Sequence, residues 1–170
     1  MAIWYGKQAN VVIGSTISPG TTSSLYAQVT GSGTISSLCK DLTITPGEAG
    51  VDALNVFGTQ IMEESRPDLV NADFTMVFSD ASNFASLTSW ATVAASTGYV
   101  RYQGGDYTGG RSKRAIAFQV AQAGVGTTNV LMNNAVMVNQ GEISLAADGS
   151  AEQTMSAACL VSDFYVEDNF

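Results

Sequence analysis

The chain has 170 residues, no histidine and a formal net charge of -8, from 7 Lys and Arg residues against 15 Asp and Glu residues. Without histidine, Ser-His-Asp triads, Cys-His pairs and His-metal sites are excluded. The negative charge argues against a protein that grips nucleic acid, because Lys and Arg contacts to phosphates supply most non-specific affinity. We therefore expect no enzyme, no bound cofactor and no metal site.

The length fits one domain over residues 1–170, since domains run at roughly 100–200 residues. Cys39 and Cys159 lie far apart without the spacing of a zinc site, so we expect two buried, reduced thiols. The N-terminus lacks the pattern of a signal peptide, and no apolar run approaches the ~18 residues that cross a bilayer. These features predict a protein that is made in the cytoplasm and enters no membrane.

Alternating segments separated by turns predict a mainly β fold, a sandwich or barrel. The first clear strand carries Leu38, Leu42 and Ile44 on one face, which Lys40 interrupts. Residues 46–67 follow as a long loop with apolar residues among acidic ones, and loops of this kind usually make contacts. The next strand, in the sequence LVNADFTMVFS, places three large apolar residues on its buried face: Phe74, Met76 and Phe78.

One segment, at about residues 81–97, departs from this alternation. Phe84, Leu87 and Trp90 recur there at steps of three and four residues, which predicts one flanking α-helix. Gly98 is placed to end that helix in a left-handed conformation. We expect the Phe84, Leu87 and Trp90 stripe to pack the helix against the sheet.

Residues 103–114 form a second long loop, which is rich in glycine. From Gly105 to Ser112 it nearly matches the P-loop spacing, but Arg111 stands where Lys is needed. The residues that follow alternate as a strand and do not open a phosphate-binding helix, which favours a hairpin loop over a nucleotide site. Contact with an acidic neighbouring subunit is favoured over nucleic acid for its basic residues, Arg111, Lys113 and Arg114.

Residues 114–122 alternate again, with Ile116, Phe118 and Val120 on one face. Towards the C-terminus, the Asp148-Gly149 pair predicts a hairpin connection between two long strands. The sequence of the whole chain therefore predicts strands with a single helix.

The order of these features resembles the major tail tube proteins of long-tailed bacteriophages and related tailed viruses. The resemblance lies in a strand ending DLTITPGE, a long loop, a strand starting RPDLVNADFTMVF, one helix in DASNFASLTSWA and a glycine-rich hairpin. The closing stretch contains GEISLAADGSAEQT, which comes nearest to a family signature. The resemblance implies a β-sandwich or barrel with a flanking helix, in hexameric rings that stack into a hollow tail tube through which viral DNA passes.

It also implies a virion protein that assembles in the host cytoplasm, with tape-measure, tail-terminator and baseplate or tip proteins as partners. Six copies of -8 give -48 per ring, and a wall of that sign lets DNA slide without specific binding. In such proteins a long loop and the N- and C-terminal arms commonly bridge rings. On this chain the implied inter-ring contacts are Glu48, Asp52, Val56, Phe57, Ile61, Met62 and Glu64, and the arm anchors are Ile3, Trp4, Tyr5, Phe164, Tyr165 and Phe170.

Two alternatives from other classes stay open. A different β-rich virion component, such as a head-completion or decoration protein, would share the self-associating character. A surface adhesin or carbohydrate-binding β-sandwich would carry an export signal. Hollow rings or tubes in electron microscopy would favour the tail tube over both.

Overall fold

The computed structural model describes residues 9–20, 22–47, 50–56, 59–65, 69–77, 91–103, 113–122, 126–139, 143–144 and 151–169. Within them, the strands are β1 (Ala9–Gly14), β2 (Gly33–Pro46), β3 (Gly50–Val56), β4 (Thr59–Ser65), β5 (Leu69–Val77), β6 (Ala91–Ser96), β7 (Tyr99–Gln103), β8 (Arg114–Gln122), β9 (Gly126–Asn139), β10 (Ile143–Ser144), β11 (Glu152–Leu160) and β12 (Phe164–Asn169). The helix α1 spans Leu25–Ser32, and the short 3-10 helix η2 spans Val161–Asp163.

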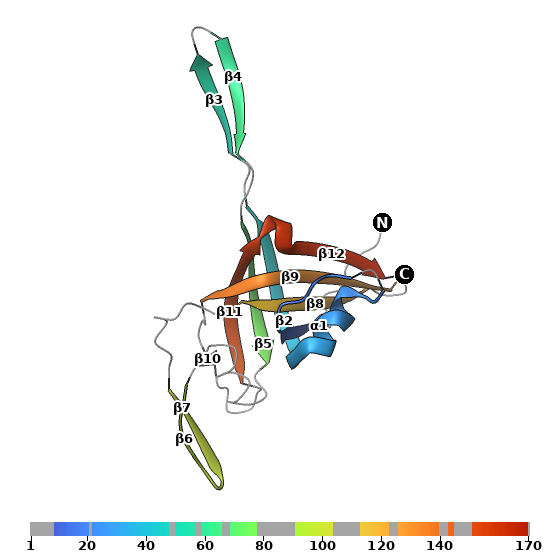
Figure 1. Ribbon diagram of the computed structural model, residues 1–170, viewed down its shortest axis with the longest axis vertical. Helices are drawn as coiled ribbons and strands as arrows, with labels where there is room; N and C mark the ends of the chain where they lie inside the picture. The colour runs from blue at the N-terminus through green and yellow to red at the C-terminus, as the bar shows by residue number, and fades with distance from the viewer. Residues whose placement is uncertain are drawn as a thin grey trace.

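Eight strands form one sheet, in the order β10-β11-β5-β2-β1-β8-β9-β12 (Figure 1). A further pairing of β11 with β9 closes six of these strands into a barrel. We call β1, β8 and β9 the helix-covered wall, because α1 packs on their outer side. We call β2, β5 and β11 the polar wall.

The barrel interior is apolar because strands of both walls place an apolar side chain inward at every second position. β5 follows the predicted pattern, with Phe74 and Met76 buried, while Phe78 lies outside the described residues. On β8, Ile116, Phe118 and Val120 face the same interior, as predicted. The rings of Phe74 and Phe118 meet edge to face, with centroids 5.1 Å apart, so the two walls pack through an aromatic pair.

A second apolar cluster lies between the helix-covered wall and α1. Ala115 and Ala117 of β8 are fully buried on the side opposite Phe118, and their small side chains let Leu25 and Val29 of α1 approach the sheet closely. The Ser24 hydroxyl accepts the Ala27 backbone N–H at 3.2 Å, which caps the first turn of the helix.

The fold class is confirmed, but the helix predicted at about residues 81–97 does not extend over its last part. Residues 91–96 form β6, and the Gly98 φ of +97° serves the tight turn to β7 instead of ending a helix. β-Branched Thr92 and Val93 favour the strand. The predicted packing residues Phe84, Leu87 and Trp90 lie outside the described residues.

The predicted long loop at residues 46–67 contains two strands, β3 and β4. β3 and β4 pair antiparallel from Gly50 opposite Ser65 to Val56 opposite Thr59. Acidic and polar residues interrupt the apolar ones in this segment. The strict alternation that predicts a strand is therefore absent from the sequence. At the ends of the second predicted loop, β7 runs to Gln103 and β8 begins at Arg114, while residues 104–112 lie outside the described residues.

One strand differs in detail from the prediction. β2 shifts register between Cys39 and Asp41, so Leu42 and Ile44 pack against the barrel core while Leu38 is 56% exposed. The Asp148-Gly149 pair lies outside the described residues; next to it, Ile143 and Ser144 of β10 pair with Gln153 and Glu152 of β11.

Candidate assembly surfaces

The β3–β4 hairpin projects beyond the ends of β2 and β5 (Figure 1). Among the described strands, β3 and β4 pair only with each other. The Gly47 N–H donates to the Leu69 carbonyl at 2.9 Å where the hairpin leaves the barrel. An isolated two-stranded hairpin is marginally stable in water, so this hairpin is suited to packing against another surface.

The hairpin register separates the predicted inter-ring residues into two groups. Asp52 stands opposite Glu63, which puts two acidic residues in one cross-strand pair. Asp52, Val56 and Ile61 share one face of the hairpin by register; Met62 and Glu64 share the other. Glu48 and Phe57 lie outside the described residues. β3 and β4 contain no Lys or Arg, so a polar partner for them would be basic or neutral.

Exposed apolar side chains surround the base of the hairpin, and sequence reasoning did not find them. Leu69 at the start of β5 stands opposite Leu160 at the end of β11, and Val161 follows. They are 47%, 52% and 41% exposed. We call these three residues the apolar collar. Strand-end positions carry no sequence signal for exposure, because exposure depends on where the neighbouring strands stop.

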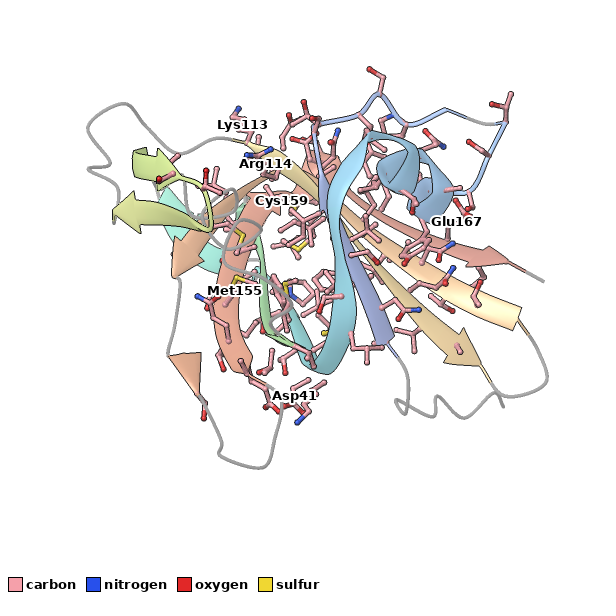
Figure 2. The ribbon with its side chains drawn as sticks, turned by 90° about the horizontal axis from the view of Figure 1, so that it is seen from below. Asp41, Lys113, Arg114, Met155, Cys159 and Glu167 are labelled. Atoms are coloured by element: carbon pink, nitrogen blue, oxygen red, sulfur yellow. The ribbon has the colours of Figure 1, made fainter. Side chains whose placement is uncertain are left out.

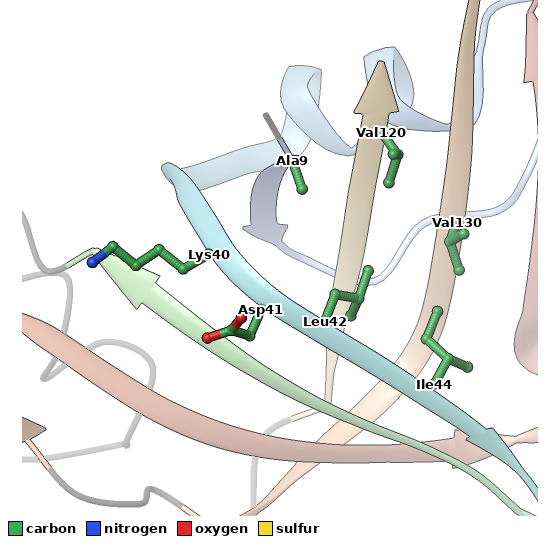
Figure 3. Close-up of a pocket in the computed structure, with 7 residues that line it drawn as sticks. All are labelled: Ala9, Lys40, Asp41, Leu42, Ile44, Val120 and Val130. Carbon is green, nitrogen blue, oxygen red and sulfur yellow. The ribbon is translucent and has the colours of Figure 1, made fainter. Parts of the chain in front are cut away.

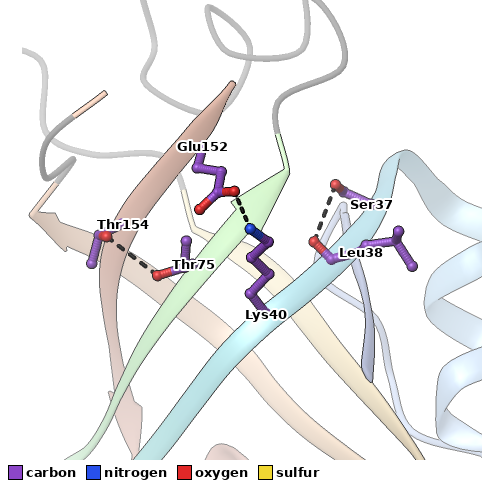
Figure 4. A network of polar contacts seen from close by, with 6 residues as sticks. All are labelled: Ser37, Leu38, Lys40, Thr75, Glu152 and Thr154. Carbon is purple, nitrogen blue, oxygen red and sulfur yellow. Dashed lines mark hydrogen bonds and ion pairs between the residues drawn. The ribbon is translucent and has the colours of Figure 1, made fainter. Parts of the chain in front are cut away.

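The outer side of the polar wall is a second surface, the polar face (Figure 4). The hydroxyls of Thr75 and Thr154 lie 3.2 Å apart across β5 and β11, and the Ser156 hydroxyl donates to the Asp73 carboxylate. The polar face consists of Thr43, Thr45, Asn71, Asp73, Thr75, Thr154 and Ser156.

An ion pair ends the polar face. Lys40 of β2 reaches across β5 to Glu152 of β11, and both side chains are partly exposed. A pair in contact with solvent adds little stability, but it neutralises the one lysine that β2 carries. The polar face is therefore neutral to acidic and rich in hydroxyl groups.

The C-terminal segment is the sheet strand β12, not a free arm. Phe164 packs against the barrel core and Tyr165 against the α1 cluster. One Glu167 carboxylate oxygen accepts the Leu25 N–H at 2.9 Å, at the start of α1, and the other accepts the Asn129 side-chain amide at 3.4 Å (Figure 2). These contacts fix β12 to α1. The other predicted anchors Ile3, Trp4, Tyr5 and Phe170 lie outside the described residues.

Of the three predicted basic contact residues, the structure describes two, Lys113 and Arg114, which are adjacent in the chain. Lys113 is exposed just before β8, and Arg114 is half-buried opposite Ala135 of β9 (Figure 2). Arg111 lies outside the described residues.

Both cysteines are free and face the barrel interior. Burial raises the pKa of the Cys39 thiol to about 11, and the Asp41 charge adds to the effect. Burial likewise raises the pKa of Cys159 to about 11, with a smaller effect of the Asp163 charge. Both thiols are therefore protonated and weakly nucleophilic at neutral pH.

Within the described ranges, no group of three or more His, Cys, Asp or Glu residues is arranged to hold a metal ion. No helix in the same part of the chain has the length and apolar character needed to cross a membrane.

The solved structures that this chain is similar to include three from contractile injection systems. A chain of the sheath–tube complex of an extracellular contractile injection system, PVC, in its extended state has a TM-score of 0.51 and 8% identity, over 98% of this chain and 93% of that one. The anti-feeding prophage cap that terminates the AFP tube has a TM-score of 0.48 and 12% identity, over 99% and 95%. The PVC sheath/tube terminator in its extended state has a TM-score of 0.43 and 10% identity, over 95% and 94%.

No family model matches the chain, and no curated protein matches its sequence. The likeness to the PVC sheath–tube complex extends over nearly all of both chains. It confirms the predicted tail-tube-like fold, a mainly β barrel with one helix.

Proposed function

We propose that this chain is a non-enzymatic structural protein whose copies form hexameric rings that stack into a hollow tube of a tailed virion or related particle. The single observation that carries the proposal is the β3–β4 hairpin. It leaves the barrel as an isolated two-stranded sheet, and the fold it belongs to is shared with a chain of a sheath–tube complex.

The hairpin and the apolar collar together supply a surface for a second copy. Single exposed apolar residues are normal, but three grouped at the root of a projecting hairpin make a patch suited to protein contact. Burying Leu69, Leu160 and Val161 would remove apolar area from water at about 25 cal/mol per Å². We assign the hairpin and this collar to contact between rings.

The polar face is proposed to line the bore. The opposite outer surface, on β1, β8 and β9, is occupied by α1. A bore that passes DNA must not hold it, and Lys and Arg contacts to phosphates are what hold it. A hydroxyl-rich face whose lysine is paired with Glu152 meets that requirement.

Partners follow from the same proposal. The tube would join tape-measure, tail-terminator and baseplate or tip proteins, and double-stranded DNA would transit without specific binding. Exposed Lys113 is proposed to contact an acidic surface of a neighbouring copy, together with Arg111 and Arg114.

Negative-stain microscopy of the concentrated protein tests the proposal. We expect rings with a central hole, or hollow tubes. The Leu160→Asp variant should form fewer or shorter stacks, since it places a charge in the collar. Val138→Asp is the matched control, because Val138 is a similarly exposed valine (50%) on β9. A protein that stays a compact monomer at high concentration contradicts the proposal.

A further inference from the structure

Two hairpins extend from opposite ends of the barrel (Figure 1). β2 runs past Lys40, Leu42 and Ile44 towards the β3–β4 hairpin, whereas the antiparallel β5 ends near Lys40 (Figure 3). β6 and β7 follow β5 in the chain, and their hairpin lies beyond that end of the barrel. When copies stack in one orientation, each hairpin therefore projects towards the end of the next copy that carries the other hairpin.

The two hairpins carry opposite charges. β3 and β4 contain Asp52, Glu63 and Glu64 and no basic residue. β6 and β7 contain Arg101 and no acidic residue. Opposite charges that meet across an interface attract each other, whereas two acidic hairpins would repel each other. The charges therefore favour contact between unlike hairpins.

The register of the β3–β4 hairpin groups two of its acidic residues with apolar ones. Asp52 and Glu63 are directly opposite each other, and they share one face of the hairpin with Leu54 and Ile61. We call these four residues the acidic face. Like charges in one cross-strand pair destabilise a hairpin, so this pair is stabilised by a cation from another surface.

The β6–β7 hairpin has a face of complementary composition. Tyr99, Arg101 and Gln103 share one face of β7, because successive residues alternate. We call these three residues the arginine face. Arg101 stands opposite Ala94, a small residue. Tyr and Arg are enriched among the residues that contribute most to protein interfaces, so this face suits a protein partner.

The spacing of the two faces matches when the hairpins lie side by side and point in opposite directions. The acidic pair lies two residues from Gly50, at the base of its hairpin. Arg101 lies two residues from Tyr99, next to the turn of its own hairpin. Two residues span about 7 Å of strand in both cases. Arg101 thus comes level with the acidic pair when Tyr99 comes level with the base.

We propose that the arginine face of one copy packs on the acidic face of the next copy in the stack. Arg101 then lies over Asp52 and Glu63, and the exposed turn at residues 95–98 reaches the apolar collar. Each copy uses both hairpins, so the contact is head-to-tail and repeats along the tube. The inference rests on the proposed function, because it needs stacked copies.

Exchanging the charges tests the proposal by negative-stain microscopy. Arg101→Glu should shorten the stacks severalfold, because it brings a third carboxylate to the acidic pair. Adding Asp52→Arg to the same chain should restore the stack length of the unmodified protein. Val100→Glu is the matched control, because the register assigns Val100 to the opposite face of β7, and it should leave stack length unchanged.

Three results of the charge exchange would overturn the proposal. The first is an Arg101→Glu variant with stacks of normal length. The second is a double variant with stacks as short as those of Arg101→Glu. The third is an equal loss for Val100→Glu.

A disulfide measures the contact directly. One chain carries Leu54→Cys, and an isotopically heavy chain carries Ala91→Cys, the register partner of Gln103. The two chains are mixed, assembled and oxidised. We expect a light–heavy disulfide dimer, severalfold more than with Thr92→Cys, which the register assigns to the other face. Equal yields, or no light–heavy dimer, would overturn the proposal.

Failure of this proposal is distinct from failure of the proposed function. Tubes of the unmodified protein, together with normal stacks of Arg101→Glu, would overturn the hairpin contact and leave the tube intact. An unmodified protein that forms neither rings nor tubes would overturn both.

Discussion

The two walls of the barrel share one apolar interior and differ on their outer sides. On β8, in the helix-covered wall, Phe118 faces the interior and Ala117 is equally buried beneath α1. On β5, in the polar wall, Phe74 is buried while Asp73 is exposed and Thr75 partly so. The outer side of the helix-covered wall is thus covered by α1 of the same chain. The outer side of the polar wall carries hydroxyl and carboxylate groups, which suit a surface that faces solvent.

The largest expected effect on stability distinguishes the buried face of β5 from its exposed face. Phe74→Ala should lower the free energy of unfolding by about 3–5 kcal/mol, because it leaves a cavity between the walls. Its neighbour Thr75→Ala should cost about 0.5 kcal/mol or less, as for most surface changes. Urea denaturation measures both, and similar losses would mean that β5 does not separate core from surface.

Alkaline pH should lower the free energy of unfolding through the two thiols, which lie on strands β2 and β11 of the polar wall. Their folded pKa of about 11 is above the ordinary value of 9.0, so the stability they contribute is complete below pH 9 and is lost as pH rises towards 11. The loss is at most about 1.4 kcal/mol per pH unit for each thiol. A Cys39→Ala/Cys159→Ala variant should show a shallower fall of stability between pH 9 and 11; an unchanged slope would contradict this cause.

Enlarging an alanine should distinguish the covered wall from the open one. Ala117→Leu should destabilise by about 1–3 kcal/mol, since α1 leaves no space beyond it. Ala158→Leu, on the outer side of β11, should be close to neutral. Thermal unfolding compares the two, and equal effects would indicate that α1 does not pack as described.

The smallest effect concerns the contact that fixes β12 to α1. Glu167→Ala should cost about 1 kcal/mol, because the Leu25 N–H loses the acceptor at the start of the helix. Glu167→Gln keeps an acceptor oxygen and should cost less. Denaturation of both variants checks this order; an equal loss for Gln and Ala would point to the lost charge and not to the hydrogen bond.

How far the sequence predicts this fold depends on how strictly each segment alternates. β5 and β8 are predicted because large apolar residues recur at every second position, as with Phe74, Met76 and Phe118. α1 is missed because it is short and buries only Leu25 and Val29, a single i, i+4 pair in a segment rich in Ser, Thr and Gly.

The assembly surfaces are less predictable than the fold. The resemblance led to the segment that contains β3 and β4, but not to its hairpin register, which divides Asp52 and Met62 between two faces. The collar at Leu69 and Leu160 arises where neighbouring strands stop at different positions. Those positions are set by pairing across the sheet, not by local pattern.

The proposed arrangement of the barrel in a ring is tested most directly by a cryo-electron microscopy map of the assembled protein. We predict a ring whose central hole is lined by the outer faces of β2, β5 and β11, with α1 on the outside of the tube and the β3–β4 hairpin in contact with the next ring. A map in which α1 faces the hole, or an assembly without a central hole, would contradict it.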